Sequence, residues 1–163
     1  MTLYSIGHSN AAIDFFLDLL KKREIKTLVD ARSKPWSRYN PHFSREPLKL
    51  ALAEQGIVYV YLGDKIGGRP EDAAFYLGNG RVDYERLAGA DFYLEGVDRL
   101  MQLGAESRTA FMCAEADYKH CHRHWLITRT LLERGVDVLH LLHMGDSAAA
   151  DPKEFQAAQL NLF

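Results

Sequence analysis

Short apolar runs alternate along the chain with longer segments in which apolar residues recur every three or four positions. In the first such segment, Ile13, Phe16 and Leu20 would share one face of a helix. The run at residues 57–62 is β-branched and aromatic instead, which is typical of a strand. These patterns predict strands at residues 3–6, 27–31, 57–62, 109–113 and 136–142. They predict helices at residues 13–20, 44–55, 90–103 and 122–134.

Strands and helices in this alternating order predict an α/β fold with a mostly parallel sheet. We expect a single three-layer domain over residues 1–143, with about five strands and helices on both faces of the sheet. Residues 144–163 are expected to form a C-terminal tail. Because right-handed crossovers place the carboxyl ends of parallel strands at one rim, a ligand should bind at that rim.

The segment at residues 63–89 is longer than connections in compact domains usually are, and it is rich in Gly, Asp and Arg. Its length favours a lid or a binding loop over an idle connector. The pair Gly67 and Gly68 would let the backbone approach a ligand closely. No Gly-Lys-Ser/Thr follows this pair, so it is not the signature of a phosphate-binding loop.

Composition narrows the class of protein. With 163 residues, 47% of them hydrophobic, the chain can bury one core and is too short for two ordinary domains. A formal net charge of −2 gives no general attraction to nucleic acid or an anionic membrane, so phosphate binding would need a local basic cluster. No apolar segment approaches the roughly 20 residues that span a bilayer, and the N-terminus lacks a signal-peptide pattern. We therefore expect a cytoplasmic protein that does not bind membranes.

The two cysteines lie in the segment CAEADYKHCHRH, the strongest chemical pattern of the chain. Cys113 ends a predicted strand, and Cys121 comes with His122 and Arg123 at the start of a predicted helix. Because a helix N-terminus and nearby positive charges favour a thiolate, either cysteine could be a catalytic nucleophile. His122 and Arg123 would bind an anionic substrate, and Glu115 could act as a general acid or base. Alternatively, both thiols pack as small apolar groups and Glu115 is a solvated charge.

The same segment offers ligand types for zinc, namely Cys113, His120, Cys121 and His124. The spacing contains neither Cys-x2-Cys nor His-x3-His, which are usual in closed zinc sites. Zinc binding is therefore the alternative to a thiol site, and we expect no cofactor.

Polar residues also follow the first two predicted strands. Arg32 could bind a phosphate or carboxylate through two hydrogen bonds, with Asp30 orienting it or acting as a base. The alternative is an ion pair between Asp30 and Arg32 that only fixes the loop. His8 could be catalytic or merely structural. The remaining candidates at the rim are the substrate-binding residues Gly7, Ser9, Ser37, Gly67 and Gly68.

Four ordered segments resemble a known family. They are SIGHS after the first strand, VDARSKPWSR after the second, GIVYVYLGDKIGGRP through the third and FMCAEADYKHCHRHWL around the cysteines. From residue 4 to about residue 142, the chain thereby resembles the prokaryotic family called domain of unknown function 488. Ala31 departs from the Val expected there, which should affect packing only. The resemblance implies an α/β fold and a polar site without naming an activity. Its motif positions are Gly7, His8, Ser9, Asp30, Arg32, Pro35, Ser37, Gly67, Gly68, Cys113, Glu115, Cys121, His122 and Arg123.

A weaker resemblance links the Asp-x-Arg pattern and the strand-end cysteine to rhodanese-type domains. However, Glu115 and Asp117 follow Cys113 closely and would repel an oxyanion in a backbone cradle. A phosphatase cradle is disfavoured as well, because the sixth residue after Cys113 is Lys119 rather than Arg. Sulfur transfer and phosphate-ester cleavage are therefore disfavoured alternatives.

Three functions fit these patterns. The first is an enzyme that uses Cys113 or Cys121 on an anionic small molecule, nucleotide or nucleic acid held by Arg32 and Arg123. The second is a binding or adaptor module without turnover, in which the same rim holds a ligand. The third is a metal-binding protein that uses the Cys/His cluster.

The chain ends with an abrupt apolar cluster after a small, polar tail. Its last five residues resemble the short motif with which bacterial DNA repair and replication proteins bind their sliding clamp, in which Gln and a Leu-Phe pair fill two pockets. The resemblance implies a link to DNA repair and a weakened docking at Asn161, where Ser or Asp is usual. Alternatively, the cluster folds back onto its own domain or a second copy. The implied clamp-binding residues are Gln159, Leu160, Leu162 and Phe163.

We predict that a peptide of the last eight residues binds the bacterial sliding clamp with micromolar affinity, as isothermal titration calorimetry would measure. Burial of Leu162 and Phe163 would supply about 1.5–3 kcal/mol each. Deleting these two residues should abolish binding and leave the melting temperature of the domain unchanged. No binding at high micromolar clamp, or a large loss of thermal stability on deletion, would favour the structural arm instead.

Overall fold

The computed structural model describes the backbone of residues 1–160 and the side chains of residues 1–156. The predicted clamp-binding peptide, residues 159–163, therefore lies outside the residues whose side chains are described. The strands are β1 (Thr2–Gly7), β2 (Thr27–Asp30), β3 (Val58–Tyr61), β4 (Thr109–Cys113), β5 (Asp137–Leu141) and β6 (Ser147–Ala149). The α-helices are α1 (Ile13–Lys22), α2 (Arg45–Glu54), α3 (Gly63–Ile66), α4 (Tyr84–Ala88), α5 (Asp91–Glu106), α6 (Arg129–Glu133) and α7 (Lys153–Leu160). The other helical segments are η1 (Pro41–Phe43), η2 (Ala73–Phe75), η3 (Tyr118–His120) and the π-helical η4 (Arg123–Thr128).

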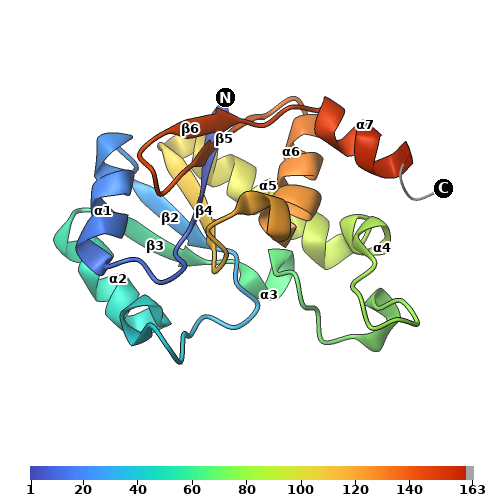
Figure 1. Ribbon diagram of the computed structural model, residues 1–163, viewed down its shortest axis with the longest axis horizontal. Coiled ribbons are helices and arrows are strands. Elements are labelled where there is room, and N and C mark those ends of the chain that lie inside the picture. Colours follow the sequence, from blue (N-terminus) through green and yellow to red (C-terminus); the bar gives the residue numbers. More distant parts are fainter. Residues whose placement is uncertain (161–163) are drawn as a thin grey trace.

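A six-stranded sheet in the order β3-β2-β4-β1-β5-β6 forms the centre of the molecule (Figure 1). The first five strands of the chain run parallel to their neighbours, and β6 pairs antiparallel with β5. The predicted α/β fold with a mostly parallel sheet is therefore confirmed. The sequence pattern does not predict β6, because Ser147–Ala149 is three small residues without an apolar alternation. Part of the expected C-terminal tail is thus the edge strand of the sheet.

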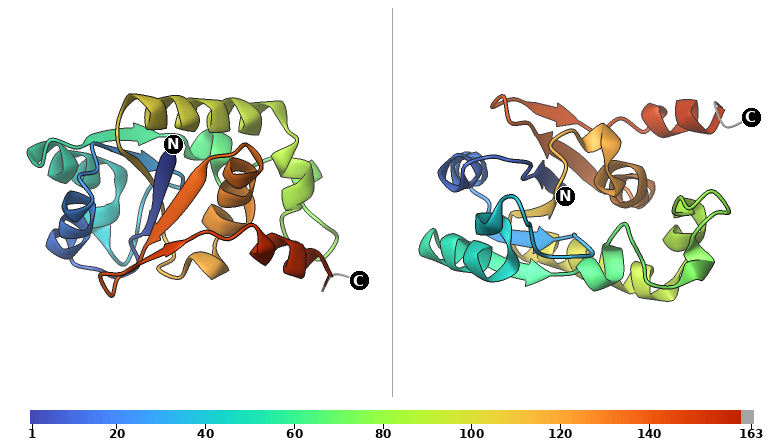
Figure 2. Two further views of the ribbon diagram at one scale, coloured as in Figure 1. Left: turned by 90° about the horizontal axis from the view of Figure 1, so that it is seen from above. Right: turned by 60° about the horizontal axis from the view of Figure 1, so that its bottom comes forward.

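Helices cover both faces of the sheet (Figure 2). Successive residues of a strand point to opposite faces, and the buried strands carry apolar residues on both, so each face needs a covering layer. On one face, Leu28 and Met112 pack in a core with residues of α1 and α2. On the other face, Val29 and Phe111 pack in a second core with residues of α5 and α6. This arrangement is the predicted three-layer domain.

The connections that leave the neighbouring strands β1 and β4 diverge to opposite faces of the sheet, and we call the point between the carboxyl ends of these strands the crevice. β1 leads to α1, whose residues belong to one core, whereas β4 leads to η4 and α6, whose residues belong to the other. Adjacent parallel strands whose connections leave to opposite faces bind ligands at that point in open α/β sheets. The cysteine segment follows β4 directly and therefore lies at the crevice.

Two segments differ from what the sequence pattern predicts. The connection at 63–89 contains α3, η2, α4 and an antiparallel bridge between Tyr76 and Val82. The helix predicted at 122–134 forms in two parts, with the π-helical η4 ahead of α6. π-helical turns insert an extra residue and often occur at functional sites.

The C-terminal helix α7 is attached to the domain through buried histidines. Glu154 Oε2 lies 3.0 Å from His124 Nε2, and the ring of Phe155 lies 4.7 Å from the His124 ring. His124 in turn contacts His140, whose Nδ1 lies 2.5 Å from Ser5 Oγ on β1. Among the described residues, no helix has the length and apolar character needed to cross a bilayer.

We predict that Gly7→Ala destabilises the protein strongly. An added Cβ at Gly7 would lie 1.7 Å from the carbonyl oxygen of Glu115, so the crevice between β1 and β4 would have to open. The free energy of unfolding should fall by about 3 kcal/mol or more, measured by urea denaturation. Gly78→Ala is the matched control, because nothing lies within 4 Å of its added Cβ. A loss of less than about 1 kcal/mol in Gly7→Ala would contradict this packing.

Candidate functional site

The candidate site begins where the backbone segments after β1 and β4 join. Gly7 and Cys113 are register partners at the ends of these strands. Beyond them, the amide of His8 donates a hydrogen bond to the Cys113 carbonyl at 3.0 Å. The amide of Ser9 donates to the Ala114 carbonyl at 2.8 Å. These bonds hold the SIGHS segment directly against the start of the cysteine segment.

An ion pair between Asp30 and Arg32 is buried beside this junction. Arg32 Nε lies 2.9 Å from Asp30 Oδ1, and Arg32 Nη2 lies 2.8 Å from Oδ2. The Tyr59 hydroxyl donates to the same carboxylate at 2.5 Å, and burial together with this hydrogen bond raises the pKa of Tyr59 well above its ordinary value. The third nitrogen of Arg32, Nη1, lies 3.3 Å from His8 Nε2. Every guanidinium nitrogen of Arg32 therefore already has a partner within the chain.

His8 is a neutral imidazole in this arrangement. Its Nδ1 donates to the Ser9 carbonyl at 2.8 Å, so Nε2 keeps a lone pair that accepts from Arg32 Nη1. The ring is buried and stacks on Phe43 with centroids 4.5 Å apart. Burial, reinforced by the charge of Arg32, lowers the pKa of His8 to about 4.

The two cysteines are free and lie close enough at the crevice for each to shift the pKa of the other. Burial alone would raise the pKa of Cys113, but the neighbouring Cys121 side chain and the charge of Arg123 outweigh it and lower this pKa. The pKa of Cys121 is raised strongly, first by the neighbouring Cys113 side chain and then by burial. Cys113 is therefore the more acidic of the two cysteines.

Arg123 is the largest fully buried side chain of the described residues, with 1% of its surface exposed. Its Nη2 donates to the Ala116 carbonyl at 3.3 Å. Within the described part of the chain, Nε and Nη1 of Arg123 have no hydrogen-bond partner. A buried guanidinium is costly unless a negative group compensates it. A thiolate at Cys113 would supply one negative charge, and two donor nitrogens of Arg123 are still available for an anion.

His122 connects the thiol pair to the Asp30–Arg32 pair. Its Nε2 donates to the carbonyl of Ala31 at 3.1 Å, which leaves Nδ1 free to accept at 3.5 Å from Cys121 Sγ. Burial lowers the pKa of His122 to about 4, so its ring is neutral near pH 7. The backbone of Gly68 packs against this ring, because an added Cβ would lie 2.6 Å from it.

The structure brings most predicted site residues into one region and leaves a few apart from its chemistry. Glu115 contributes its backbone carbonyl, while its side chain is exposed. Ser37 is used within its own turn, where its Oγ accepts from the Asn40 amide at 3.1 Å. Gly67 lets the loop pass over Ser33, whose Oγ would lie 2.2 Å from an added Cβ. The residues gathered at the crevice are Gly7, His8, Ser9, Asp30, Arg32, Gly68, Cys113, Cys121, His122 and Arg123.

The residues proposed for zinc are spread apart. His120 is exposed and lies 3.5 Å from Asp117, whereas His124 is buried against His140 and Glu154. In the part of the chain that is described, no group of three His, Cys, Asp or Glu residues could hold a metal ion.

A groove of about 1040 Å³ adjoins the thiol pair, and the sequence reasoning did not assign its residues. Gly68 and Tyr84 belong to its wall, and Tyr84 is close enough for the thiols to contribute to the rise of its pKa, after burial. Arg69, Arg81 and Trp125 also line it. The interleaving of Arg and aromatic residues in the segment at 63–89 is the pattern that could have identified this wall.

Comparison with known proteins places the chain in a family without supplying an activity. The family model described as "Domain of unknown function DUF488" matches residues 12–130. No curated protein and no solved structure matches the chain.

We predict that His8 makes the protein less stable in mild acid. Its pKa is about 4 in the folded protein against an ordinary value of 6.5, so the unfolded chain binds the proton first as the pH falls. The stabilisation is complete above about pH 6.5 and is lost progressively down to about pH 4. Between these values, His8→Gln should reduce the slope of unfolding free energy against pH by up to about 1.4 kcal/mol per pH unit.

Urea denaturation at several pH values measures these slopes. His120→Gln is the matched control and should keep the wild-type slope, because 77% of the His120 side chain is exposed. An unchanged slope in His8→Gln would show that His8 takes up its proton equally in the folded and unfolded states.

Proposed function

The chain belongs to the DUF488 family, and we propose that it is an enzyme in which Cys113 is a thiolate nucleophile for a substrate with an anionic group. The observation that carries this proposal is the buried guanidinium of Arg123, which has two donor nitrogens without partners in the described chain and lies beside the thiol pair. Polar groups that are buried and unpaired in a native structure call for a ligand or another specific role.

Cys113 is the better nucleophile of the two cysteines. A thiolate attacks, whereas a thiol does not, and the pKa of Cys113 is lowered while that of Cys121 is raised. Cys113 also ends a strand at the crevice, where ligands bind in parallel sheets. Cys121 and Arg123 both favour the thiolate form of this sulfur.

The remaining residues have complementary roles in the proposed reaction. Arg123 binds the anionic group of the substrate and places an electrophilic atom against Cys113 Sγ. A bond forms between this sulfur and that atom as the bond to the leaving group breaks. Cys121 can transfer its proton to the leaving group, and the neutral ring of His122 can accept a proton at Nδ1 when the adduct is resolved.

The burial of Cys113, which is 1% exposed, favours a second candidate function. In this alternative the domain is a binding or adaptor module without turnover, and the Arg123 site holds a ligand permanently. The C-terminal peptide would then supply its contact with the sliding clamp. Under the first proposal, a substrate reaches Cys113 past Gly68 and Tyr84, the two residues through which the groove adjoins the thiol pair.

We predict that Cys113 prefers an anionic alkylating reagent. The measured quantity is the rate of modification by iodoacetate divided by the rate of modification by iodoacetamide. At neutral pH this ratio should be at least about tenfold larger for Cys113 than for a free thiol, because Arg123 attracts the carboxylate of iodoacetate. Arg123→Gln should abolish this preference and Arg123→Lys should keep most of it. Peptide mass spectrometry over time measures both rates at each cysteine.

The ratio of the two rates removes any effect of Arg123 on the pKa of Cys113, since both reagents require the same thiolate. Arg99→Gln removes an equal charge from the exposed surface of α5 and should leave the ratio unchanged. If neither cysteine reacts in the folded protein, or if the ratio equals that of a free thiol, the binding module is the better description.

A further inference from the structure

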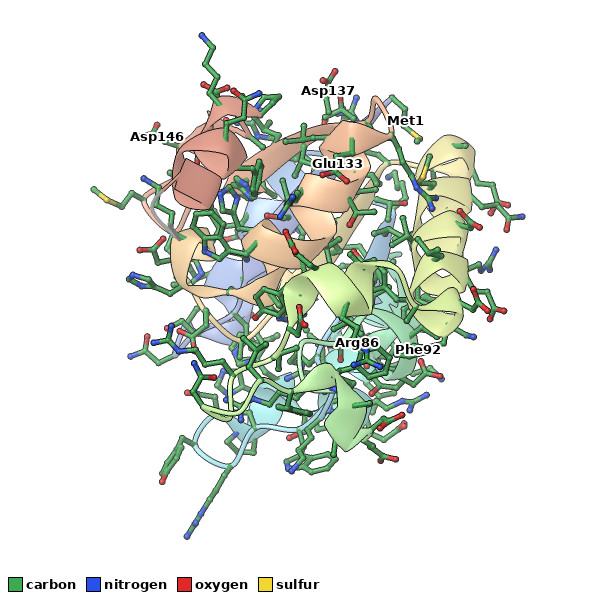
Figure 3. All side chains as sticks on the ribbon, turned by 90° about the vertical axis from the view of Figure 1, so that its right-hand side faces the viewer. Met1, Arg86, Phe92, Glu133, Asp137 and Asp146 are labelled. Carbon is green, nitrogen blue, oxygen red and sulfur yellow. The ribbon has the colours of Figure 1, made fainter. Side chains whose placement is uncertain are left out.

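The groove beside the thiol pair has walls from several elements. They come from the segment at 63–89, from η4 and α6, and from Phe155 on α7. Figure 3 shows this face, with Arg86 on α4 and Glu133 on α6 labelled. At about 1040 Å³ the groove lies just above the range for small-molecule sites, which is about 300–1,000 Å³. We call it the loop groove.

Four aromatic side chains line the loop groove, namely Tyr76, Tyr84, Trp125 and Phe155. Three of them are held in place by contacts within the chain. The indole Nε1 of Trp125 donates to the Lys119 carbonyl at 2.6 Å, and the Phe155 ring meets the indole edge-on at 5.8 Å. The Tyr76 hydroxyl donates to the Pro70 carbonyl at 2.8 Å. Flat rings fixed in this way are a stacking surface for another flat ring.

The loop groove also offers guanidinium groups to an anion. Arg69 and Arg81 are exposed, and within the described residues their guanidinium groups have neither a hydrogen bond nor an ion pair. Arg129 shares its charge with Glu133 at 3.1 Å. The lining also contains the carboxylates of Glu85 and of Asp83, which accepts the Arg86 amide at 3.2 Å. Arg69 and Arg81 are therefore the donors of the lining that can pair with a phosphate.

The backbone of the groove wall fixes where these two arginines lie. The bridge between Tyr76 and Val82 closes a hairpin, and the Leu77 amide donates to the Arg81 carbonyl at 2.7 Å. The Arg69 amide donates to Ser33 Oγ at 2.9 Å, next to Arg32 of the crevice. A ligand that contacts both arginines would therefore extend from the hairpin to the loop that carries Gly68 and Arg69.

We propose that the loop groove binds a nucleotide unit, whose base stacks on the aromatic wall and whose phosphate pairs with Arg69 and Arg81. Stacking on aromatic residues beside a basic surface is how single-stranded nucleic acids are bound without sequence preference. The inference rests on the proposed function in one respect, since it names the substrate class that would reach Cys113. A free mononucleotide and an unpaired strand share this chemistry, and the experiment distinguishes them.

Fluorescence anisotropy of a labelled, short oligothymidylate tests the proposal with the full chain. The oligonucleotide should bind, and Arg69→Gln/Arg81→Gln should weaken binding at least about tenfold through the loss of two charged phosphate contacts. Trp125→Leu should weaken it at least about fivefold through the loss of stacking. Arg99→Gln, which removes a charge outside the groove, should bind like the wild type.

Competition identifies the ligand chemistry. Thymidine monophosphate that competes as well as the oligonucleotide assigns the groove to free nucleotides, whereas much weaker competition assigns it to unpaired strands. The proposal is overturned if the oligonucleotide does not bind or if the arginine variant binds it normally. It is also overturned if two results occur together, namely that tripolyphosphate competes as well as the oligonucleotide and that Trp125→Leu has no effect on binding.

The same proteins separate this inference from the proposed enzyme. Oligonucleotide binding without any preference of Cys113 for iodoacetate would refute the thiolate enzyme and leave the nucleotide groove standing. The opposite result would support the Arg123 site and refute the groove.

Discussion

A guanidinium group with almost no exposure to solvent costs several kcal/mol unless negative charge and hydrogen bonds compensate it. Arg123 is such a group, and its charge contributes to the pKa shifts of several side chains around it. It adds to the effect of Cys121 in lowering the pKa of Cys113, and it adds to the effect of burial in lowering the pKa of His122 and of His140. The buried cation and burial itself therefore favour the neutral form of these imidazoles, while the cation favours negative charge on the sulfur.

The fold makes this arrangement possible by bringing backbones unusually close together. Gly7 allows β1 to lie against the carbonyl of Glu115. Gly63, the first residue of α3, lies so close to the loop after β2 that an added Cβ would be 1.7 Å from the Arg32 carbonyl oxygen. Gly68 brings the loop groove to His122 in the same way. The ion pair of Asp30 with Arg32 fixes the loop between these contacts.

The sequence predicts the layers well because apolar periodicity reports burial directly. The strand predicted at 109–113 has the same bounds as β4. The positions of the first five strands along the chain also agree with the predicted alternation of strands and helices. The pattern cannot reveal β6, which buries little, nor the π-helical turn at Arg123. Motif spacing places the cysteines at the rim. It does not show that the guanidinium of Arg32 is fully hydrogen-bonded to Asp30 and His8. It also does not show that Arg123 has two donor nitrogens without partners in the described chain. The contact of His8 with Arg32 joins residues 24 positions apart, and motif spacing does not report such contacts.

The most direct test of this account is the ultraviolet absorbance of thiolate in the native protein as a function of pH. The account predicts one thiolate per chain at pH 7, which disappears in Cys113→Ser and persists in Arg99→Gln. In Arg123→Met the same absorbance should appear only at higher pH, because burial then raises the pKa of Cys113 without an opposing charge. Two protonated thiols at pH 7 that ionise near the free value of about 8.5 would contradict the account.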